Sequence, residues 1–381
     1  MRTIPLEDGP VRLVGALDLD RSATGITPRR LPDWTRPQVP LFMEYMVTQP
    51  SGVRLEFTTD ARSLELDVIT TQLEFPGRKK TDIVFDLILD DADTRSGTAA
   101  GGNRLVIADL TRRNDAELVP GEAATLRFDD LPEGAKRCEL WLPSNAMVEL
   151  RALRVDDEAE VEASEPLPRR RWVHHGSSIS HCSGAHSPSR TWPAVAARLA
   201  GVELLNLGLG GNCHLDPFVA RTMRDQPADV ISLKAGINVV NADSLKERTF
   251  APALHGFLDT IREGQPDTPI LVASPIICPS AETNPGPTVP NSDGVFETIP
   301  GHESVRPGSL TLQRMREIMA AVIELRQPSD PNLHYLDGLE LFGPNDVADL
   351  PDALHPNGDG YVRMGERFCQ LAFGPGRPLA G

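Results

Sequence analysis

The sequence predicts two folded parts, an N-terminal all-β sandwich of the jelly-roll type and a C-terminal α/β domain built on a parallel sheet. In the first 155 residues, apolar and polar residues alternate in short runs, as in strands with one solvent-facing side. After residue 172, short β-rich runs alternate with helical patterns, which predicts a parallel sheet covered on both faces. Between them lies a stretch with six acids, two prolines and no apolar period.

Turn-forming pieces such as Pro50-Ser51-Gly52 separate the alternating runs of the first part. Many short strands without a helical pattern between them are typical of a sandwich or jelly roll. We expect the strands at 54–58, 63–68, 82–89, 124–128, 138–142 and 148–155. This places a β-sandwich domain at 1–160, a linker at 161–171 and the α/β domain at 172–381.

The α/β part begins with a predicted strand at 171–176. Further strands are expected at 202–208, 230–236, 270–275 and 333–338, and helices at 192–200, 217–224, 245–262, 310–326 and 358–371. The segment 279–308 has six prolines, four glycines and no period. Ordered loops of that length often cover a site, and a mobile surface insertion is the alternative.

Composition excludes several classes of protein. A chain of 381 residues is longer than most single domains with one hydrophobic core. Its content of 40% hydrophobic and 24% charged residues is typical of globular proteins. The net charge of −16 argues against nucleic-acid and anionic-membrane partners. Five sparse cysteines do not suggest a secreted disulfide scaffold, and neither a signal peptide nor a membrane span is evident. We therefore expect a cytoplasmic protein.

The unusual residues lie where predicted strands end. The first loop reads HHGSSISH (174–181), the second NLGLGGN (206–212) and the third GIN (236–238), and DALHP (352–356) precedes the last helix. In parallel sheets, reactive groups gather at the carboxyl ends of the strands. Each motif alone is weak evidence, but their order along the chain is unlikely to arise by chance.

This set of motifs resembles the SGNH hydrolases, also called the GDSL esterase/lipase family, over about residues 172–373. The resemblance implies a three-layer, flavodoxin-like domain with Ser178 as nucleophile, His355 as base and Asp352 as its orienting acid. It also implies an oxyanion hole formed by Ser178, Gly211 and Asn238. Two positions depart from the family pattern, which usually has Asp where this chain has Ser177 and Val239.

Other interpretations of these motifs stay open. Ser177 and Ser180 are alternative nucleophiles, the D-x-x-H pair could cap a helix, and the glycines of 206–212 could cradle a phosphate. The His and Cys residues of 174–186 and 213–214 are zinc-ligand types, but their spacing fits no common zinc pattern, so we expect no metal. Among them, His181 and His214 are candidates for substrate contact.

A serine, a histidine and an oxyanion hole indicate acyl transfer, and the acceptor decides between two outcomes. With water the enzyme is a carboxylesterase or carbohydrate O-acetylesterase, whereas with a bound alcohol it is an O-acyltransferase. The first domain resembles the carbohydrate-binding-type jelly rolls of some sugar esterases. The whole layout is similar to acyltransferases of actinobacterial tetracycline pathways. That likeness implies no bound cofactor, acyl-coenzyme A as co-substrate, a salicylyl or other aryl group, and a polyketide glycoside hydroxyl as acceptor.

Overall fold

The structure is a computed structural model that describes residues 1–75, 80–108 and 115–381. The chain forms two compact units: Met1–Pro168 with Ala185–Ser189, and Arg169–Gly184 with Arg190–Gly381. Part of the segment 161–171, which we expected to be a linker, belongs to a sheet of the first unit. Its residues Val161–Glu162 form strand β14, which pairs antiparallel with β5 (Arg54–Thr59). The half-buried Val161 side chain thus adds to a sheet edge of the first unit.

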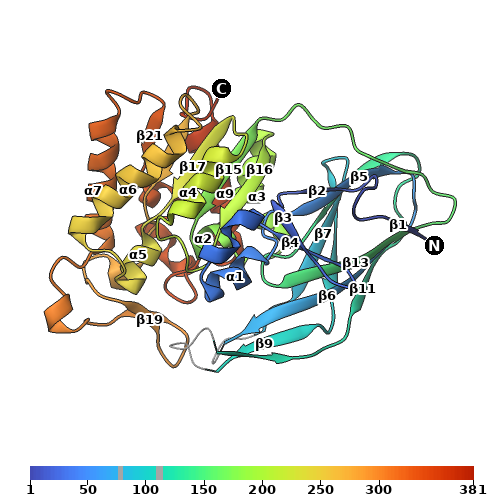
Figure 1. Cartoon of the computed structure of the whole chain (residues 1–381), viewed down its shortest axis with the longest axis horizontal. Helices are drawn as coiled ribbons and strands as arrows, with labels where there is room; N and C mark the ends of the chain where they lie inside the picture. Colours follow the sequence, from blue (N-terminus) through green and yellow to red (C-terminus); the bar gives the residue numbers. More distant parts are fainter. Residues whose placement is uncertain (76–79, 109–114) are drawn as a thin grey trace. The chain divides into compact units, whose positions relative to one another are not determined.

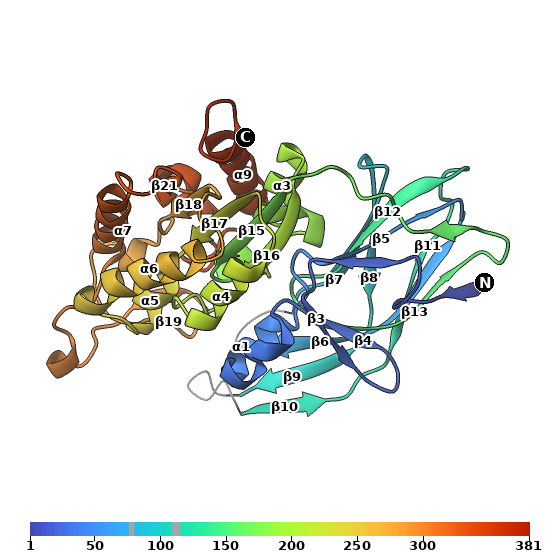
Figure 2. The same ribbon diagram turned by 45° about the horizontal axis from the view of Figure 1, so that its top comes forward.

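The first unit consists mainly of strands. They are β1 (Arg2–Ile4), β2 (Arg12–Val14), β3 (Asp18–Arg21), β4 (Ile26–Arg29), β5, β6 (Leu64–Glu74), β7 (Ile83–Leu89), β8 (Asp93–Ala99), β9 (Asn103–Ile107), β10 (Ala116–Val119), β11 (Ala124–Phe128), β12 (Lys136–Trp141), β13 (Met147–Val155) and β14. Within the described ranges, one sheet has eight strands, in the order β10-β9-β6-β13-β4-β3 with β1 on β13 and β11 on β6. The other has six, in the order β14-β5-β12-β7-β8 with β2 on β5. The described pairs are antiparallel except β6 with β9. The predicted all-β sandwich is confirmed (Figures 1 and 2).

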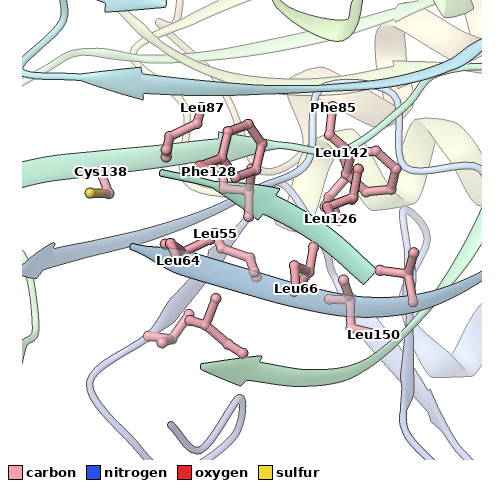
Figure 3. Close-up of a cluster of buried hydrophobic side chains, with 14 of the residues drawn as sticks. Leu55, Leu64, Leu66, Phe85, Leu87, Leu126, Phe128, Cys138, Leu142 and Leu150 are labelled. Atoms are coloured by element: carbon pink, nitrogen blue, oxygen red, sulfur yellow. The ribbon is translucent and has the colours of Figure 1, made fainter. Parts of the chain in front are cut away.

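Apolar and polar residues alternate along the strands, and the apolar side chains form the hydrophobic core between these two sheets. On β6, Leu64, Leu66 and Val68 are fully buried, while the acidic residues between them are half-exposed. Figure 3 shows Leu64 and Leu66 in one cluster with Leu55 and Leu87 of the six-stranded sheet. Each such side chain contributes about 1.5–3 kcal/mol by leaving water, so the apolar period of the sequence fixes which face each strand buries.

The first unit also contains helical structure that the sequence did not predict. A 3₁₀ turn, η1 (Asp33–Gln38), and helix α1 (Leu41–Val47) lie between β4 and β5. Helix α1 has seven residues, too few to establish an apolar period, and it is held by tertiary burial of Met43, Met46 and Val47.

The second unit is an α/β domain. Its main elements are β15 (Arg171–Gly176), α2 (Ser178–His181), α3 (Trp192–Ala200), β16 (Glu203–Gly208), α4 (Pro217–Asp225), β17 (Val230–Lys234), α5 (Ile237–Ala242), α6 (Glu247–Arg262), β18 (Ile270–Ala273), α7 (Leu312–Arg326), β21 (Leu333–Leu336), α8 (Gly338–Leu341) and α9 (Gly358–Phe368). The short turn η5 (Pro344–Asp349) and a π-helical end, η6 (Cys369–Phe373), complete it, and η2 (Pro188–Arg190) lies where the chain passes from Ala185–Ser189 back into this unit. The sheet is wholly parallel, in the order β16-β15-β17-β18-β21. The predicted parallel-sheet domain is confirmed.

Helices cover both faces of this sheet. Trp172 of β15 stacks on Phe368 of α9 with ring centroids 5.2 Å apart, and its ring lies 6.1 Å from that of Trp192 in α3. Helices α3 and α9 therefore share one face, while Figures 1 and 2 show α4, α6 and α7 on the other. In register, Gly176 at the end of β15 lies between Gly208 of β16 and Lys234 of β17. Three strand-end loops thus begin side by side.

Candidate active site

Three serines follow β15, and their side chains have different partners. Ser177 is the N-cap of α2, and its Oγ accepts a hydrogen bond from a backbone N–H of that helix at 3.3 Å. Ser180 Oγ lies 2.8 Å from Nε2 of His174. Both serines are buried, whereas Ser178 is half-buried and its Oγ lies 2.8 Å from Nε2 of His355. Of the three serines that the sequence left open, Ser178 is the one in contact with His355.

Asp352 orients the ring of His355. The Nδ1 of His355 lies 2.7 Å from Oδ2 of Asp352, and Oδ1 accepts hydrogen bonds from the backbone N–H groups of Leu354 and His355 at 3.0 and 2.7 Å. Burial of Asp352 opposes ionisation, but the hydrogen bonds and charge interaction with His355, together with the hydrogen bond from the N–H of Leu354, outweigh it and lower the pKa of the carboxyl. Because the carboxylate accepts a hydrogen bond from Nδ1–H, the ring proton stays on Nδ1 and the lone pair of Nε2 is directed at the Ser178 hydroxyl.

Close packing of α2 against the sheet places Ser178. A Cβ on Gly208 would lie 2.5 Å from the carbonyl carbon of Ser180, so only glycine allows this approach. Asn206 braces the same contact: its Nδ2 donates to the Ser180 carbonyl at 3.1 Å, and its Oδ1 accepts from the Gly208 N–H at 2.9 Å. Asn206 was not among the site residues expected from the sequence, although an asparagine two residues before a strand-end glycine was a visible signal.

Potential oxyanion donors come from the neighbouring strand ends. Gly211 lies in the loop after β16 with φ 72°, a conformation that favours glycine. Asn238 is buried in the first turn of α5, and its Oδ1 accepts a hydrogen bond from the backbone N–H of Cys213 at 3.0 Å. This bond fixes the orientation of the amide and leaves its NH₂ group as a donor on the opposite side. A third donor is the backbone N–H of Ser178, since the first N–H groups of a helix have no intrahelical acceptor.

The two histidines expected to contact substrate lie in different settings. His181 ends α2 and is buried. His214 is half-buried; its Nε2 lies 3.1 Å from the carbonyl oxygen of Gly211 and its Nδ1 lies 2.9 Å from Oγ of Ser244. His214 thus ties the Gly211 loop to the chain after α5. Substrate contact by either residue stays a prediction.

The histidines and cysteines around the nucleophile are separated by strand geometry. His174 packs on Trp192 of α3, whereas His175 stacks on Phe257 of α6, because consecutive strand residues face opposite sides. Burial lowers the pKa of His174 well below its ordinary value, so this ring is neutral. All five cysteines lie in described ranges and are free thiols. Among the described residues, no group of three or more His, Cys, Asp or Glu side chains could hold a metal ion.

The unperiodic segment 279–308, here called the strap, forms short elements and contacts the Asp352–His355 turn. It contains η3 (Pro279–Ala281), η4 (Glu303–Val305) and an antiparallel hairpin of β19 (Thr288–Pro290) and β20 (Phe296–Thr298). The backbone N–H of Phe296 donates to the carbonyl of Asp352 at 2.9 Å. Its ring meets that of His355 edge-on, with centroids 5.6 Å apart. Phe296 was not among the site residues expected from the sequence, because three-residue strands leave no readable period.

The comparisons with known proteins agree with this architecture. Residues 175–363 match the GDSL-like lipase/acylhydrolase family. The chain belongs to this family. No match to the chain is found among curated proteins. In the part of the chain that the structure describes, no helix has the length and apolar character that a bilayer crossing requires.

Several solved structures share both units. The salicylyl acyltransferase SsfX3 from a tetracycline biosynthetic pathway is similar with 30% identity and a TM-score of 0.79, over 96% of this chain and 95% of that one. A GDSL-like lipase from Bacteroides ovatus is similar with 20% identity and a TM-score of 0.67, over 96% and 95%. A family two carbohydrate esterase from Clostridium thermocellum, in complex with cellohexaose, has 14% identity and a TM-score of 0.59, over 94% and 97%. The last two show the fold alone.

Proposed function

We propose that this chain is a serine O-acyltransferase that works through an acyl-enzyme on Ser178. The acyl donor is a coenzyme A thioester, the acyl group is salicylyl or another aryl group, and the acceptor is a hydroxyl of a small natural product such as a polyketide glycoside. The observation that carries the acyl-transfer chemistry is the hydrogen-bonded series Ser178–His355–Asp352, with successive distances of 2.8 and 2.7 Å. The similarity to a salicylyl acyltransferase of a tetracycline pathway over 96% of the chain supports the acyl group and a natural-product acceptor, whereas the coenzyme A donor is part of the proposal alone.

The chemistry follows from these contacts. A serine hydroxyl is a weak nucleophile, so Nε2 of His355 accepts its proton as Oγ attacks the carbonyl carbon of the donor. Asp352 stabilises the imidazolium that forms, and this cation then protonates the leaving thiolate. In the second half-reaction, the histidine removes the proton of the acceptor hydroxyl, and the new ester leaves as Ser178 is restored.

Attack on the acyl carbonyl places negative charge on its oxygen. The NH₂ group of Asn238 and the backbone N–H groups of Gly211 and Ser178 are the donors we assign to that oxyanion. Such donors act mainly in the transition state, and removing one typically costs about 10²–10³ in turnover.

Ester hydrolysis is the second candidate function. Two observations favour it: the matching family is named for acylhydrolases, and a carbohydrate esterase shares the fold over 94% of this chain. The same three side chains would serve a carboxylesterase or a carbohydrate O-acetylesterase, with water in place of the alcohol.

Product partitioning distinguishes the two functions. The protein is supplied with salicylyl- or benzoyl-coenzyme A, and free acid and new ester are quantified as the concentration of a glycosylated polyketide alcohol rises. A transferase produces ester at the expense of acid and consumes donor faster as acceptor increases. Release of acid at a rate that no acceptor changes would instead establish an esterase.

A further inference from the structure

The turn that carries His355 is held in a strained backbone conformation. Ala353 lies in the chain between the acid, Asp352, and the base, His355, and its φ angle is 62°. A residue with a Cβ is disfavoured in this left-handed region and remains there only where surrounding contacts impose it. Two contacts lie inside the turn, where Oδ1 of Asp352 accepts from the N–H groups of Leu354 and His355.

The N–H of Ala353 donates to the carbonyl of Leu350 at 3.0 Å, and further contacts come from the strap and the residue before it. The Sγ–H of Cys278 donates to the carbonyl of Ala353 at 3.5 Å. The N–H of Phe296 donates to the carbonyl of Asp352, and the Phe296 ring abuts the His355 ring. The carbonyl groups of Asp352 and Ala353 thus both accept hydrogen bonds from this segment, and the imidazole of His355 packs edge-on against an aromatic ring.

Both ends of the strap are tied to helices. At its start, the carboxylate of Glu282 forms a two-pronged ion pair with Arg316 of α7, with distances of 2.7 and 2.8 Å. Just after its end, Ser309 donates to Asp243 at the end of α5 at 3.1 Å and accepts from Lys246 at 2.8 Å. The hairpin strand β19 also packs on α5, the helix that contains Asn238. The strap is therefore a braced element.

We propose that the strap clamps the strained Asp352–His355 turn, with Phe296 as the positioning residue for His355. This inference rests on the proposed function, because it assigns Phe296 a role through the histidine that activates Ser178. Strand alternation supplies a matched control: Phe296 lies on the hairpin face that contacts the turn, whereas Val289 pairs with Glu297 on the opposite face and is 37% exposed.

The test uses a fluorophosphonate probe, which reports activation of the serine without depending on acyl-group preference. The Ser178 Oγ–phosphorus bond forms, the phosphorus–fluorine bond breaks, the Oγ proton passes to His355 and fluoride leaves. Labelling rates are compared for wild type, Phe296→Ala, Phe296→Tyr and Val289→Ala, with kcat and KM for p-nitrophenyl acetate. Thermal unfolding of each variant checks its folding, and Phe296→Leu replaces the alanine variant if that one does not fold.

We expect Phe296→Ala to slow labelling about 10- to 100-fold, as expected for a displaced catalytic group, and to lower kcat with KM nearly unchanged. Phe296→Tyr should restore most of the rate and Val289→Ala should match wild type. Equal labelling of Phe296→Ala and wild type would overturn the clamp while leaving the proposed function intact. A wild type that is not labelled at Ser178 would instead overturn the proposed function.

Discussion

Lys234 is a buried lysine at the end of a central strand. It ends β17 next to Gly176, its side chain is 1% exposed, and its Nζ has no hydrogen-bond partner among the described residues. Burial lowers the pKa of Lys234 to about 8, with smaller opposing effects from Cys213 and Cys182. Lys234→Met keeps the unbranched apolar stem and removes the amine, so we expect the variant to be more stable than wild type.

The size and the pH dependence of this gain follow from the pKa. Lowering the pKa of Lys234 from 10.5 to about 8 corresponds to about 3 kcal/mol of destabilisation at neutral pH. The cost is fully present below pH 8, where the amine is charged in both the folded and the unfolded chain. It disappears as pH rises towards 10.5, because the folded protein releases its proton first and the unfolded chain binds more protons over that interval. The advantage of Lys234→Met therefore shrinks between pH 8 and 10.5.

Urea unfolding at pH 7 and pH 10 measures this difference, with Lys80→Met as the control for an exposed lysine. The account predicts a gain of about 1–3 kcal/mol for Lys234→Met at pH 7, a smaller gain at pH 10, and no change for Lys80→Met at either pH. A variant less stable than wild type at pH 7 would refute this reasoning. So would a gain that is the same at both pH values.

Three further predictions concern the site and the first unit. Asp352→Asn should lower kcat for an activated ester about 10⁴-fold, because the neutral amide no longer selects the imidazole tautomer; a loss under tenfold would count against the triad. Asn238→Ala should lower kcat about 10²–10³-fold with KM changed little, and a change confined to KM would exclude an oxyanion role. Asp86 is buried and accepts hydrogen bonds from two serines of Ala185–Ser189 at 2.5 and 2.6 Å. Asp86→Ala should cost about 1–3 kcal/mol in thermal unfolding, and an unchanged melting temperature would contradict this.

The sequence predicted elements whose apolar period runs long enough to read. The strand at 171–176 and the helix at 192–200 have the predicted bounds, because a fully buried strand and a helix on the same sheet face both leave continuous apolar signals. Strands β1–β4, with three or four residues each, and helix α1, with two helical turns, lack this signal because they are too short to show a period and are specified by the tertiary contacts they make.

For the active site too, the sequence predicts local contacts better than contacts between distant residues. The D-x-x-H spacing fixes the local Asp352–His355 pair, since it depends on residues three apart. The choice of Ser178 over Ser177 and Ser180 depends on where each hydroxyl finds a partner in space. Phe296 could not be found at all, because it reaches His355 from 59 positions away along the chain through a hairpin without a period.

The central claim is that Ser178 carries the acyl group, and intact-mass measurement tests it most directly. Wild type and Ser178→Ala are incubated with a panel of aryl- and alkyl-coenzyme A thioesters, and the intact mass of each protein is measured by mass spectrometry. The account predicts an added acyl mass on wild type alone, which persists in water and clears when a polyketide or glycoside alcohol is added. An equal adduct on Ser178→Ala, or neither adduct nor turnover with any thioester or activated ester, would contradict it.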